Sequence, residues 1–377
     1  MDGDINSMDE RFMDRALELA ARAYGRTSPN PMVGAVVVRD GKIVGEGYHA
    51  RAGEDHAEVV ALRDAGESVR DATLYVTLEP CSHYGRTPPC VDAIISAGIR
   101  RVVAAMTDPN PLVAGAGFRR LKDAGIEVDV GMRQAEAGRL NEAHVKFCRT
   151  GLPFVYLKYA MSLDGKVATR TKDARWVTGE DARRRVHELR DRVDAIMVGA
   201  GTVRADDPAL TTRLPDGGRD PVRIVVSTMG DLDPSARVFA DDGGAPRWLA
   251  VADGCPVERL GMFENRGVDI LNCPATAQGL DLRETMRLVG ERDVRTVLLE
   301  GGPTLAAAAL ESGIVDKIMC FIAPIVIGGM DAPSPVAGRG IERIADALRL
   351  TDVGIELVGS DVLIEGYIGR DTKCLQV

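Results

Sequence analysis

A histidine and two cysteines in the first half of the chain place the strongest constraint on its fold. His56 opens the run His-Ala-Glu, Cys81 follows Pro80, and eight residues separate Cys81 from Cys90. Imidazole and thiolate groups are the ligands that zinc prefers, and three of them leave the fourth tetrahedral position open for water. If all three bind one ion, the fold must bring together segments that are distant in the sequence.

Glu58 stands two residues after His56, where it can act beside a metal without ligating it. Zinc lowers the pKa of its bound water from about 16 toward 7. A nearby carboxylate can take the proton and return it to a ring nitrogen and the departing ammonia. Zinc deaminases carry His-x-Glu followed by Pro-Cys-x-x-Cys, and this chain matches the first half but has a longer cysteine loop. The pattern predicts a hydrolytic deaminase with His56, Cys81 and Cys90 on zinc and Glu58 as the catalytic acid and base.

Two other interpretations of the same residues stay open. His83 lies within the cysteine loop and could supply a fourth ligand, which would close the site and make the metal structural. Alternatively, Cys81 and Cys90 are buried thiols, which are common in protein cores, and His56 only opens a helix.

Three segments of the first half together resemble the bifunctional deaminase/reductase family of riboflavin biosynthesis: Ser28–Pro31, Gly47–Glu58 and Pro80–Cys90. That family acts on a ribosylaminopyrimidine 5-phosphate. The resemblance implies that Asn30, His49, His83 and Thr87 surround the pyrimidine and its phosphate. For His49, a surface position or a place behind the metal ligands is the alternative.

Helix and strand signals alternate through the first half, at the spacing of an α/β domain. Helices are expected over about 9–24, 56–65, 90–97 and 118–124, with another ending near 147, and strands over 33–38, 43–44, 73–78, 102–105 and 127–130. This order resembles the cytidine deaminase-like fold, a mixed sheet between helices. His56 and Cys90 both fall where a helix begins, so they can face one crevice.

Gly151 and Pro153 interrupt a polar stretch, Arg149–Pro153, that predicts a linker between two domains. We expect a deaminase domain over 1–148 and a second domain over 153–377. In the second half, apolar runs at 154–159, 195–198, 222–226, 248–251, 296–299 and 317–326 predict strands buried on both faces. A helix is expected from Glu180 to about Val193, capped by Thr178, and the pattern favours a doubly wound sheet.

Paired glycines at Gly301-Gly302 separate an apolar strand from an Ala-rich helix. Such a turn lets backbone amides approach a phosphate at the helix N-terminus, although a strand-to-helix turn also needs glycine for steric reasons alone. This turn and the segments 158–166, 176–178 and 198–213 resemble the reductase half of the same family. Its fold is similar to dihydrofolate reductase and its cofactor is NADPH.

The resemblance implies roles for residues of the second half. Ala160, Trp176, Thr202 and Asp206 would line the NADPH, with Gly302, Pro303, Thr304, Leu305 and on to Ala308 at its phosphates and Ser227 as a less distinctive contact. Arg190, Leu210, Arg213 and Glu300 would hold the substrate, and Lys158, Asp206 and Glu300 are candidate proton carriers. Ala174 stands where the family often has a substrate-contacting serine, so that contact is in doubt. Trp176 could instead fill a core, and Arg190 could belong to a solvated charged face with Arg183, Arg184 and Arg185.

Composition agrees with such an enzyme. A chain of 377 residues is long enough for two domains, and a net charge of −9 argues against a dedicated nucleic-acid binder. The seven cysteines have no disulfide-framework spacing, the N-terminus is acidic and polar, and no apolar run approaches the about 20 residues that span a bilayer. A cytoplasmic location is expected. A homo-oligomer is expected from the family resemblance alone.

Two other functions compete with this hypothesis. A nucleic-acid adenosine deaminase would share His-x-Glu, but it would not explain the cysteine loop or the second domain, and it would favour a basic rim. A non-catalytic zinc module joined to a nucleotide-sensing domain would have a closed metal site and would not depend on Glu58.

Overall fold

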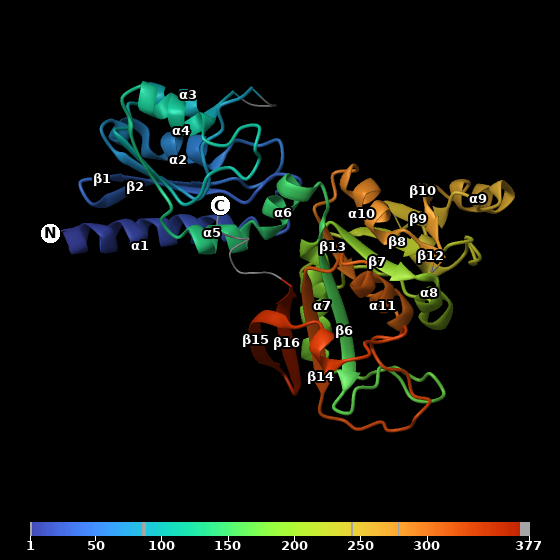
Figure 1. The fold of residues 1–377 in the computed structure, drawn as a ribbon. Helices are drawn as coiled ribbons and strands as arrows, with labels where there is room; N and C mark the ends of the chain where they lie inside the picture. The colour runs from blue at the N-terminus through green and yellow to red at the C-terminus, as the bar shows by residue number, and fades with distance from the viewer. Residues whose placement is uncertain (1, 85–87, 243, 278, 370–377) are drawn as a thin grey trace. The chain divides into compact units, whose positions relative to one another are not determined.

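The chain folds into two units, one ending at Gly151 and the other beginning at Leu152 (Figure 1). The computed structural model describes residues 2–84, 88–242, 244–277 and 279–369. Helices of the first unit are α1 (Asp2–Ala21), α2 (Ala57–Ala65), α3 (Cys90–Ala97), α4 (Ala116–Asp123), α5 (Gln134–Leu140) and α6 (Glu142–Thr150), with a 3₁₀ turn at Gly66–Val69. Its strands are β1 (Gly34–Arg39), β2 (Lys42–Tyr48), β3 (Thr73–Val76), β4 (Arg101–Ala104) and β5 (Glu127–Val130).

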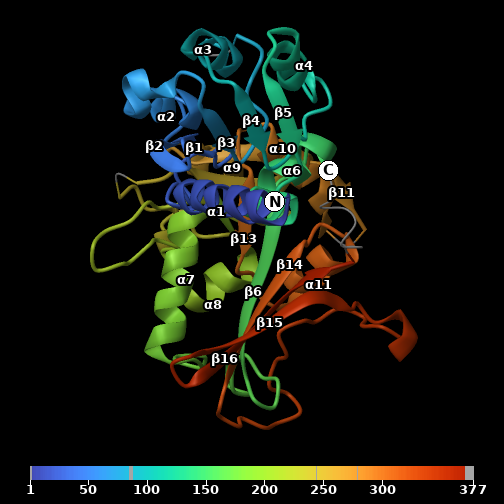
Figure 2. The same cartoon turned by 90° about the vertical axis from the view of Figure 1, so that its left-hand side faces the viewer.

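The five strands form one mixed sheet in the order β2-β1-β3-β4-β5. β1 is antiparallel to β2 and β3, whereas β3, β4 and β5 are parallel. Side chains alternate between faces along each strand. Ala35 and Val37 pack with α2, α3 and α4 on one face, while Val36 and Val38 pack with α1, α5 and α6 on the other. Helices therefore cover both faces of the sheet (Figure 2).

Helices of the second unit are α7 (Glu180–Arg192), α8 (Ala200–Asp206), α9 (Val257–Glu264), α10 (Leu282–Gly290) and α11 (Pro303–Glu311), with 3₁₀ turns at Arg237–Phe239 and Ile344–Asp346. Its strands are β6 (Phe154–Ser162), β7 (Ala195–Gly199), β8 (Val222–Val226), β9 (Arg247–Ala252), β10 (Asp269–Cys273), β13 (Thr296–Leu299), β14 (Lys317–Ala323), β15 (Leu350–Val358) and β16 (Asp361–Ile368). The short strands β11 (Ala275–Thr276) and β12 (Gly279–Leu280) pair separately.

The large sheet of this unit has the order β10-β9-β8-β7-β13-β6-β14-β16-β15. The strands from β10 to β14 are parallel, and the β15–β16 hairpin continues the sheet in antiparallel fashion. Val155 and Leu157 pack with α10 and α11 on one face, and Ile196 and Val198 pack with α8 and α9 on the other. The predicted winding with helices on both faces is present, and the antiparallel edge is the difference.

Several predicted details of these elements differ in the structure, among them one helix cap and two element ends. The N-cap of α7 is Gly179, whose N–H donates to Asp361 Oδ2 at 2.8 Å, so Thr178 does not cap the helix. β14 ends at Ala323 rather than Val326, because Pro324 follows and has no N–H for the sheet. α6 runs on to Thr150, where Gly151 ends it with a φ of 70°.

Candidate active sites

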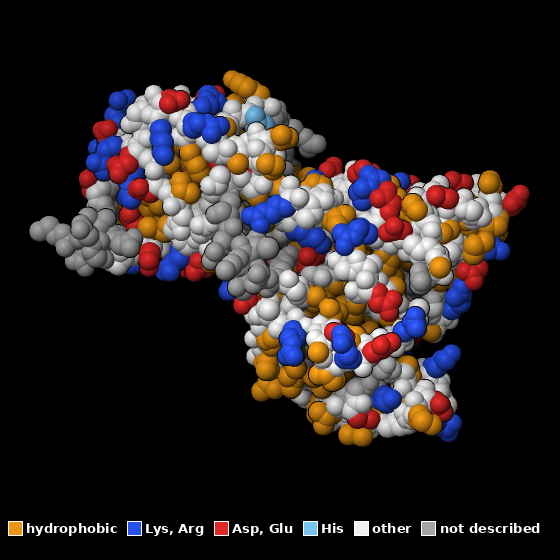
Figure 3. Space-filling model, in the orientation of Figure 1, with side chains coloured by type: hydrophobic (Ala, Val, Ile, Leu, Met, Phe, Trp, Pro, Cys, Tyr) orange, Lys and Arg blue, Asp and Glu red, His pale blue; other side chains and the backbone are white. Residues whose placement is uncertain are grey.

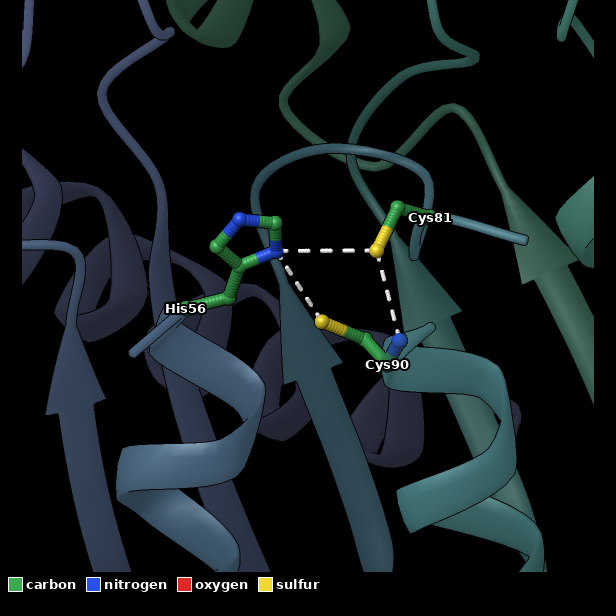
Figure 4. Close-up of side chains that lie close together, drawn as sticks. All are labelled: His56, Cys81 and Cys90. Carbon is green, nitrogen blue, oxygen red and sulfur yellow. Dashed lines mark hydrogen bonds between the residues drawn. The ribbon is translucent and has the colours of Figure 1, made fainter. Parts of the chain in front are cut away.

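His56, Cys81 and Cys90 converge on one point of the first unit (Figure 4). His56 is the N-cap of α2, Cys90 is the first residue of α3, and Cys81 lies in the segment that follows β3. His56 Nδ1 lies 3.1 Å from Cys90 Sγ and 3.5 Å from Cys81 Sγ, and all three donor atoms lie within 4.8 Å of one another. Ligands of a tetrahedral zinc are about 3.6 Å apart for one nitrogen and one sulfur, so the three side chains fit this ion.

The cluster also favours the thiolate that a metal requires. Hydrogen bonds from Cys90 and from His56 lower the pKa of Cys81, and the Cys90 backbone N–H donates to the Cys81 sulfur at 3.2 Å. The same contact with Cys81, together with burial, raises the pKa of Cys90. One negative charge is therefore already favoured at this point.

Glu58 lies in the first turn of α2 and is only 3% exposed. Burial and the negative charge of Cys81 raise the pKa of Glu58 to about 7, which suits a group that must both take and return a proton. The position of α2 depends on Gly47 in β2, because a Cβ there would lie 2.5 Å from the Ala57 carbonyl oxygen. The glycine thus allows the helix start, with His56 and Glu58, to approach the sheet.

His49 lies beside the cluster, with its ring 5.3 Å from that of His56 in an edge-to-face arrangement. It is 2% exposed, so a surface position is wrong. His49 Nε2 is 3.1 Å from Asn30 Nδ2, and His49 Nδ1 is 3.1 Å from the Asp55 carbonyl oxygen. The structure therefore brings together Asn30 and His49, two of the predicted substrate residues.

The other two predicted substrate residues of this half lie in the cysteine loop. His83 is exposed and is not part of the three-membered cluster found among the described residues. Within that part of the chain, the fourth ligand of a closed structural site is not in place. Thr87 lies outside the described residues.

Glu79 is a residue of this site that sequence reasoning missed. It lies two positions before Cys81, is 5% exposed, and accepts hydrogen bonds from the backbone N–H groups of Asp108, Gly115 and Gly117 at 2.9 to 3.1 Å. It thereby fixes the segment after β4 against the one that carries Cys81. A charged residue inside an otherwise apolar strand end, directly before Pro-Cys, was the available signal.

The second unit contains a cavity of about 590 Å³. Lys158 and Ala160 line it from β6, two positions apart and therefore on the same face of the strand. Phe321 of β14, the register partner of Ala160, lies beside them. The remaining lining residues include Ala174, Trp176, Arg183, His187, Arg190, Arg213 and Glu300.

Glu300, at the end of β13, is the centre of an ion-pair network in this cavity. Arg190 Nε and Nη2 donate to its two carboxylate oxygens at 2.8 and 3.0 Å, and Lys158 Nζ lies 3.7 Å from Oε2. Burial opposes ionisation, but the charges of Arg190 and Lys158 outweigh it and lower the pKa of Glu300 to about 2. Burial also lowers the pKa of Lys158, although Glu300 works against this.

The network distinguishes Arg190 from its neighbours on α7. Its side chain is 11% exposed, whereas that of Arg184 is 59% exposed, so Arg190 does not belong to a solvated charged face. Its guanidinium is bound to the Glu300 carboxylate and to the Thr211 carbonyl oxygen. Arg190 therefore reaches the predicted site, but it is held by protein groups there.

Trp176 and Arg213 lie at the more exposed part of the cavity. The indole is 67% exposed, so it does not fill a core, and the Arg183 guanidinium lies 4.7 Å above its ring. Arg213 contacts His187, a second residue that the sequence analysis missed. The spacing of Arg183, His187 and Arg190 along one helix was a usable signal for it.

Leu210 is 3% exposed and its side chain belongs to a hydrophobic cluster. Only its backbone can face a ligand. Its φ of 57° places it in the left-handed region that costs a branched residue about 1–2 kcal/mol. The segment around Leu210 is therefore held in an unfavourable conformation by its surroundings.

The residues predicted to bind the NADPH phosphates lie at the start of α11. Gly302 is the N-cap of α11, Pro303 is its first residue, Thr304 is exposed and Leu305 is buried. A Cβ on Gly302 would lie 3.2 Å from Thr202 Oγ1, so the starts of α8 and α11 approach closely. Gly301 is favoured for steric reasons alone, because a Cβ at this position would lie 2.9 Å from Leu305 Cδ2.

Ser227 follows Val226, the strand partner of Gly199, which is the N-cap of α8, so Ser227 lies near that helix start. Ser227 is 4% exposed and its hydroxyl donates to Asp231 at 3.1 Å. Asp206 is exposed at the end of α8 and is not among the described residues that line the cavity with Lys158 and Glu300. The structure thus brings two of the three predicted proton carriers together.

Comparison with known proteins gives each unit a match. Residues 6–106 match the family described as the cytidine and deoxycytidylate deaminase zinc-binding region. Residues 153–364 match the RibD C-terminal domain family. The fold and the two sites thus define a zinc-dependent deaminase domain joined to a reductase domain.

The similarity extends over almost the whole chain. The riboflavin biosynthesis protein RibD of Bacillus amyloliquefaciens is 44% identical over 97% of this chain and 98% of its own. RibD of Escherichia coli strain K12 is 45% identical over 94% of this chain and 98% of its own. The structure of Acinetobacter baumannii RibD covers 97% of this chain and all of its own, with a TM-score of 0.87 and 36% identity. This chain belongs to the RibD family, the bifunctional deaminase/reductases of riboflavin biosynthesis.

The predicted fold class, the two enzyme activities and the need for zinc and NADPH are confirmed by these similarities. They support a bifunctional enzyme over the zinc module with a sensing domain and over the nucleic-acid deaminase. Among the described helices, none is long and apolar enough to cross a membrane.

Proposed function

We propose that the first unit removes an amino group from 2,5-diamino-6-(5-phosphoribosylamino)pyrimidin-4-one by hydrolysis, with zinc coordinated by His56, Cys81 and Cys90. The meeting of three metal-binding atoms beside the buried carboxylate of Glu58 is the observation that supports this most directly. A structure of Thermotoga maritima described as a diaminohydroxyphosphoribosylaminopyrimidine deaminase/5-amino-6-(5-phosphoribosylamino)uracil reductase is similar, with 37% identity and a TM-score of 0.82.

Zinc would supply the Lewis acidity that makes water nucleophilic near neutral pH. Glu58 takes a proton from the attacking water and passes it to the ring nitrogen. Glu58 then carries the proton of the newly added hydroxyl group to the amino group, the carbon–nitrogen bond breaks as the carbonyl forms, and ammonia leaves. Asn30 and His49 orient the pyrimidine; their contact at 3.1 Å, next to His56, supports this. His83 and Thr87 are proposed to reach the substrate from the cysteine loop.

The second unit is proposed to reduce the deaminated product. When bound, NADPH would supply the hydride that reduces C1 of the opened ribosyl group to give ribityl. Lys158 is proposed to polarise and protonate the acceptor, with the ionised carboxylate of Glu300 holding the ammonium group, since both line the cavity and lie 3.7 Å apart. Arg190 orients Glu300, and Leu210 and Arg213 contact substrate. Ala160, Trp176, Thr202, Asp206 and Ser227 are proposed to contact NADPH, with its phosphates at Gly302–Leu305.

We assign these two activities to separate domains, 1–148 and 153–377. Zinc content measured beside single-turnover ammonia release, first without and then with NADPH, tests the assignment. One zinc per chain, ammonia without NADPH and subsequent NADPH oxidation are expected. Bound zinc without ammonia release would instead favour a structural metal or another substrate.

A homodimer is proposed as the assembled form. β15 is an edge strand whose Val353, Ile355 and Leu357 are 52, 73 and 75% exposed, and hydrophobic side chains gather over this hairpin (Figure 3). Edge strands with exposed apolar residues favour pairing with another chain. Light scattering should give twice the chain mass, and Ile355→Lys should give the monomer. We also propose a cytoplasmic location, supported by the free buried thiols of Cys255, Cys273 and Cys320.

A further inference from the structure

One face of α7 lines the reductase cavity with Arg183, His187 and Arg190. These residues are spaced by four and three positions, which places them above one another on a helix. Arg190 is held by Glu300, and Arg183 lies over Trp176. His187 contacts neither of these partners but points to Arg213, which lies in a different segment of the chain.

Arg213 is the cavity arginine that is best placed to receive an anion. Arg184 is paired with Asp181 and Arg190 with Glu300. Arg183 donates to the Thr178 carbonyl oxygen and lies over the Trp176 ring. In the part of the chain that the structure describes, no carboxylate lies within 4.0 Å of the Arg213 guanidinium. A guanidinium with unused donors at the mouth of a cavity matches the geometry of a phosphate.

His187 makes two contacts with Arg213. The Arg213 backbone N–H donates to Nδ1 at 3.3 Å, and Nη2 lies 3.3 Å from Nε2. A guanidinium nitrogen only donates, and a neutral imidazole has a single acceptor nitrogen, so His187 accepts from only one of these two donors at a time. In the tautomer that carries its proton on Nδ1, Nε2 accepts from the Arg213 guanidinium. A protonated ring would place N–H against N–H and would add a cation beside Arg190 and Arg213. The contact therefore exists only with a neutral His187.

We propose that His187 is a positioning residue of the reductase site, which holds the Arg213 guanidinium where it binds the 5-phosphate of the substrate. This rests on the proposed reductase function. It adds a residue whose role is to accept a hydrogen bond from Arg213 rather than to touch the reacting carbon. His187 then determines affinity for the phosphorylated substrate and leaves hydride transfer unaffected.

The charges around His187 keep it neutral. Burial and the cations Arg190 and Arg213 lower the pKa of His187 to about 4, with a smaller contribution from Lys158, while Glu300 works against this. The acceptor is therefore present throughout the physiological pH range. The contact weakens only as the pH falls toward 4.

The test compares full-length His187→Ala and His187→Gln with Arg213→Ala and the double variant His187→Ala/Arg213→Ala. Each is assayed on the deaminated substrate and on its 5-dephospho analogue. Glutamine retains an acceptor and cannot be protonated. We expect His187→Ala to raise KM for the phosphorylated substrate about tenfold, as for loss of a hydrogen bond to a charged group, with kcat within about twofold. The glutamine variant should recover most of this loss.

Two results would overturn the proposal. One is an equal rise of KM for both substrates. The other is a double variant whose KM exceeds that of Arg213→Ala by the full factor seen for His187→Ala alone, because the free-energy effects of independent residues add. Ammonia release serves as the control for overall integrity.

A measurement without turnover separates this proposal from the proposed function. The chain has five histidines, so an NMR titration can resolve His187, identified by its loss in His187→Gln. Its pKa should be low in the parent protein and should rise in Arg213→Ala; an unchanged pKa would show that the contact is absent. If the parent protein fails to reduce the substrate, the proposed function fails, while the titration still decides the contact.

Discussion

The two sites are built in opposite ways. The deaminase site takes its ligands from a helix N-cap, a helix start and the segment after β3, and Glu58 and His49 are 3 and 2% exposed. The reductase cavity is lined from β6, α7, β13 and the segment around Arg213, and Trp176 within it is 67% exposed. We therefore expect the deaminase site, which depends on a few buried groups, to lose its activity when any one of them is removed. The reductase cavity, which is lined by more segments, should lose only part of its activity when a single side chain is changed.

Removal of zinc should produce the largest difference between the two activities. Incubation with a chelator should abolish ammonia release, because the three ligands would then hold no Lewis acid. NADPH oxidation with deaminated substrate should stay within about twofold, because the reductase cavity contains no part of this cluster. Metal analysis beside both assays provides the check, and zinc-free protein that still releases ammonia would refute the metal role.

Glu58→Gln tests whether the carboxylate acts as a proton carrier. We expect ammonia release to fall by about 10² to 10⁴, the usual contribution of acid–base catalysis, while zinc content stays at one per chain. Reduction of deaminated substrate should be retained, and it serves as the internal control. Ammonia release at the parental rate would show that the metal site does not use Glu58.

The difference in construction also explains what the sequence could predict. His56, Glu58 and Cys90 lie at helix starts that local patterns mark, and the structure brings them together with Cys81. The pairing of Arg190 with Glu300 joins residues 110 positions apart, and only the order of strands in the sheet places them together. The β15–β16 edge and the contact of His187 with Arg213 depend on tertiary structure in the same way. The Thr178 cap was wrong because an Asp361 carboxylate from β16 already serves the Gly179 N–H.

Glu300→Gln probes the network that maintains the reductase cavity. The pKa of Glu300 is lowered to about 2, so its ionised form stabilises the fold above the pKa of the unfolded chain. That stability, about 3 kcal/mol, is present above about pH 5 and is lost as the pH falls toward 2. The variant should lose a similar amount at pH 7 and should show a flatter pH profile.

Both tryptophans, Trp176 and Trp248, belong to the second unit, so urea unfolding followed by their fluorescence reports on this unit alone. Glu188→Gln is the matched control, because Glu188 lies on α7 with Arg190 but its side chain is 33% exposed. A surface ion pair contributes about 0–1 kcal/mol. Equal losses in the two variants would contradict a special role for the buried network.

Gly47→Ala should affect the deaminase through packing alone. The added Cβ would lie 2.5 Å from Ala57 O and from Ala61 N, so α2 must shift, at a cost of about 1–3 kcal/mol. Because α2 carries Glu58 and follows His56, ammonia release should fall more than NADPH oxidation does. Gly261→Ala, where no atom lies within 4 Å of the added Cβ, is the control, and hydrogen exchange in α2 should increase only in the Gly47 variant. Equal exchange in both variants would mean that the helix tolerates the methyl group.

Ala174→Ser should produce the smallest change, and in the opposite direction. Ala174 lines the reductase cavity at a position where the family resemblance expects a substrate-contacting serine. A new hydroxyl should lower KM by about two- to tenfold, which corresponds to the net value of one hydrogen bond, with little change in kcat. Ala174→Val adds volume without a donor and should give no such gain; equal KM values for the two variants would exclude a hydrogen bond here. Because the proposed substrate contacts of the cavity come from several segments, we expect it to lack this one contact and remain a reductase, whereas the deaminase site should not tolerate the loss of a metal ligand.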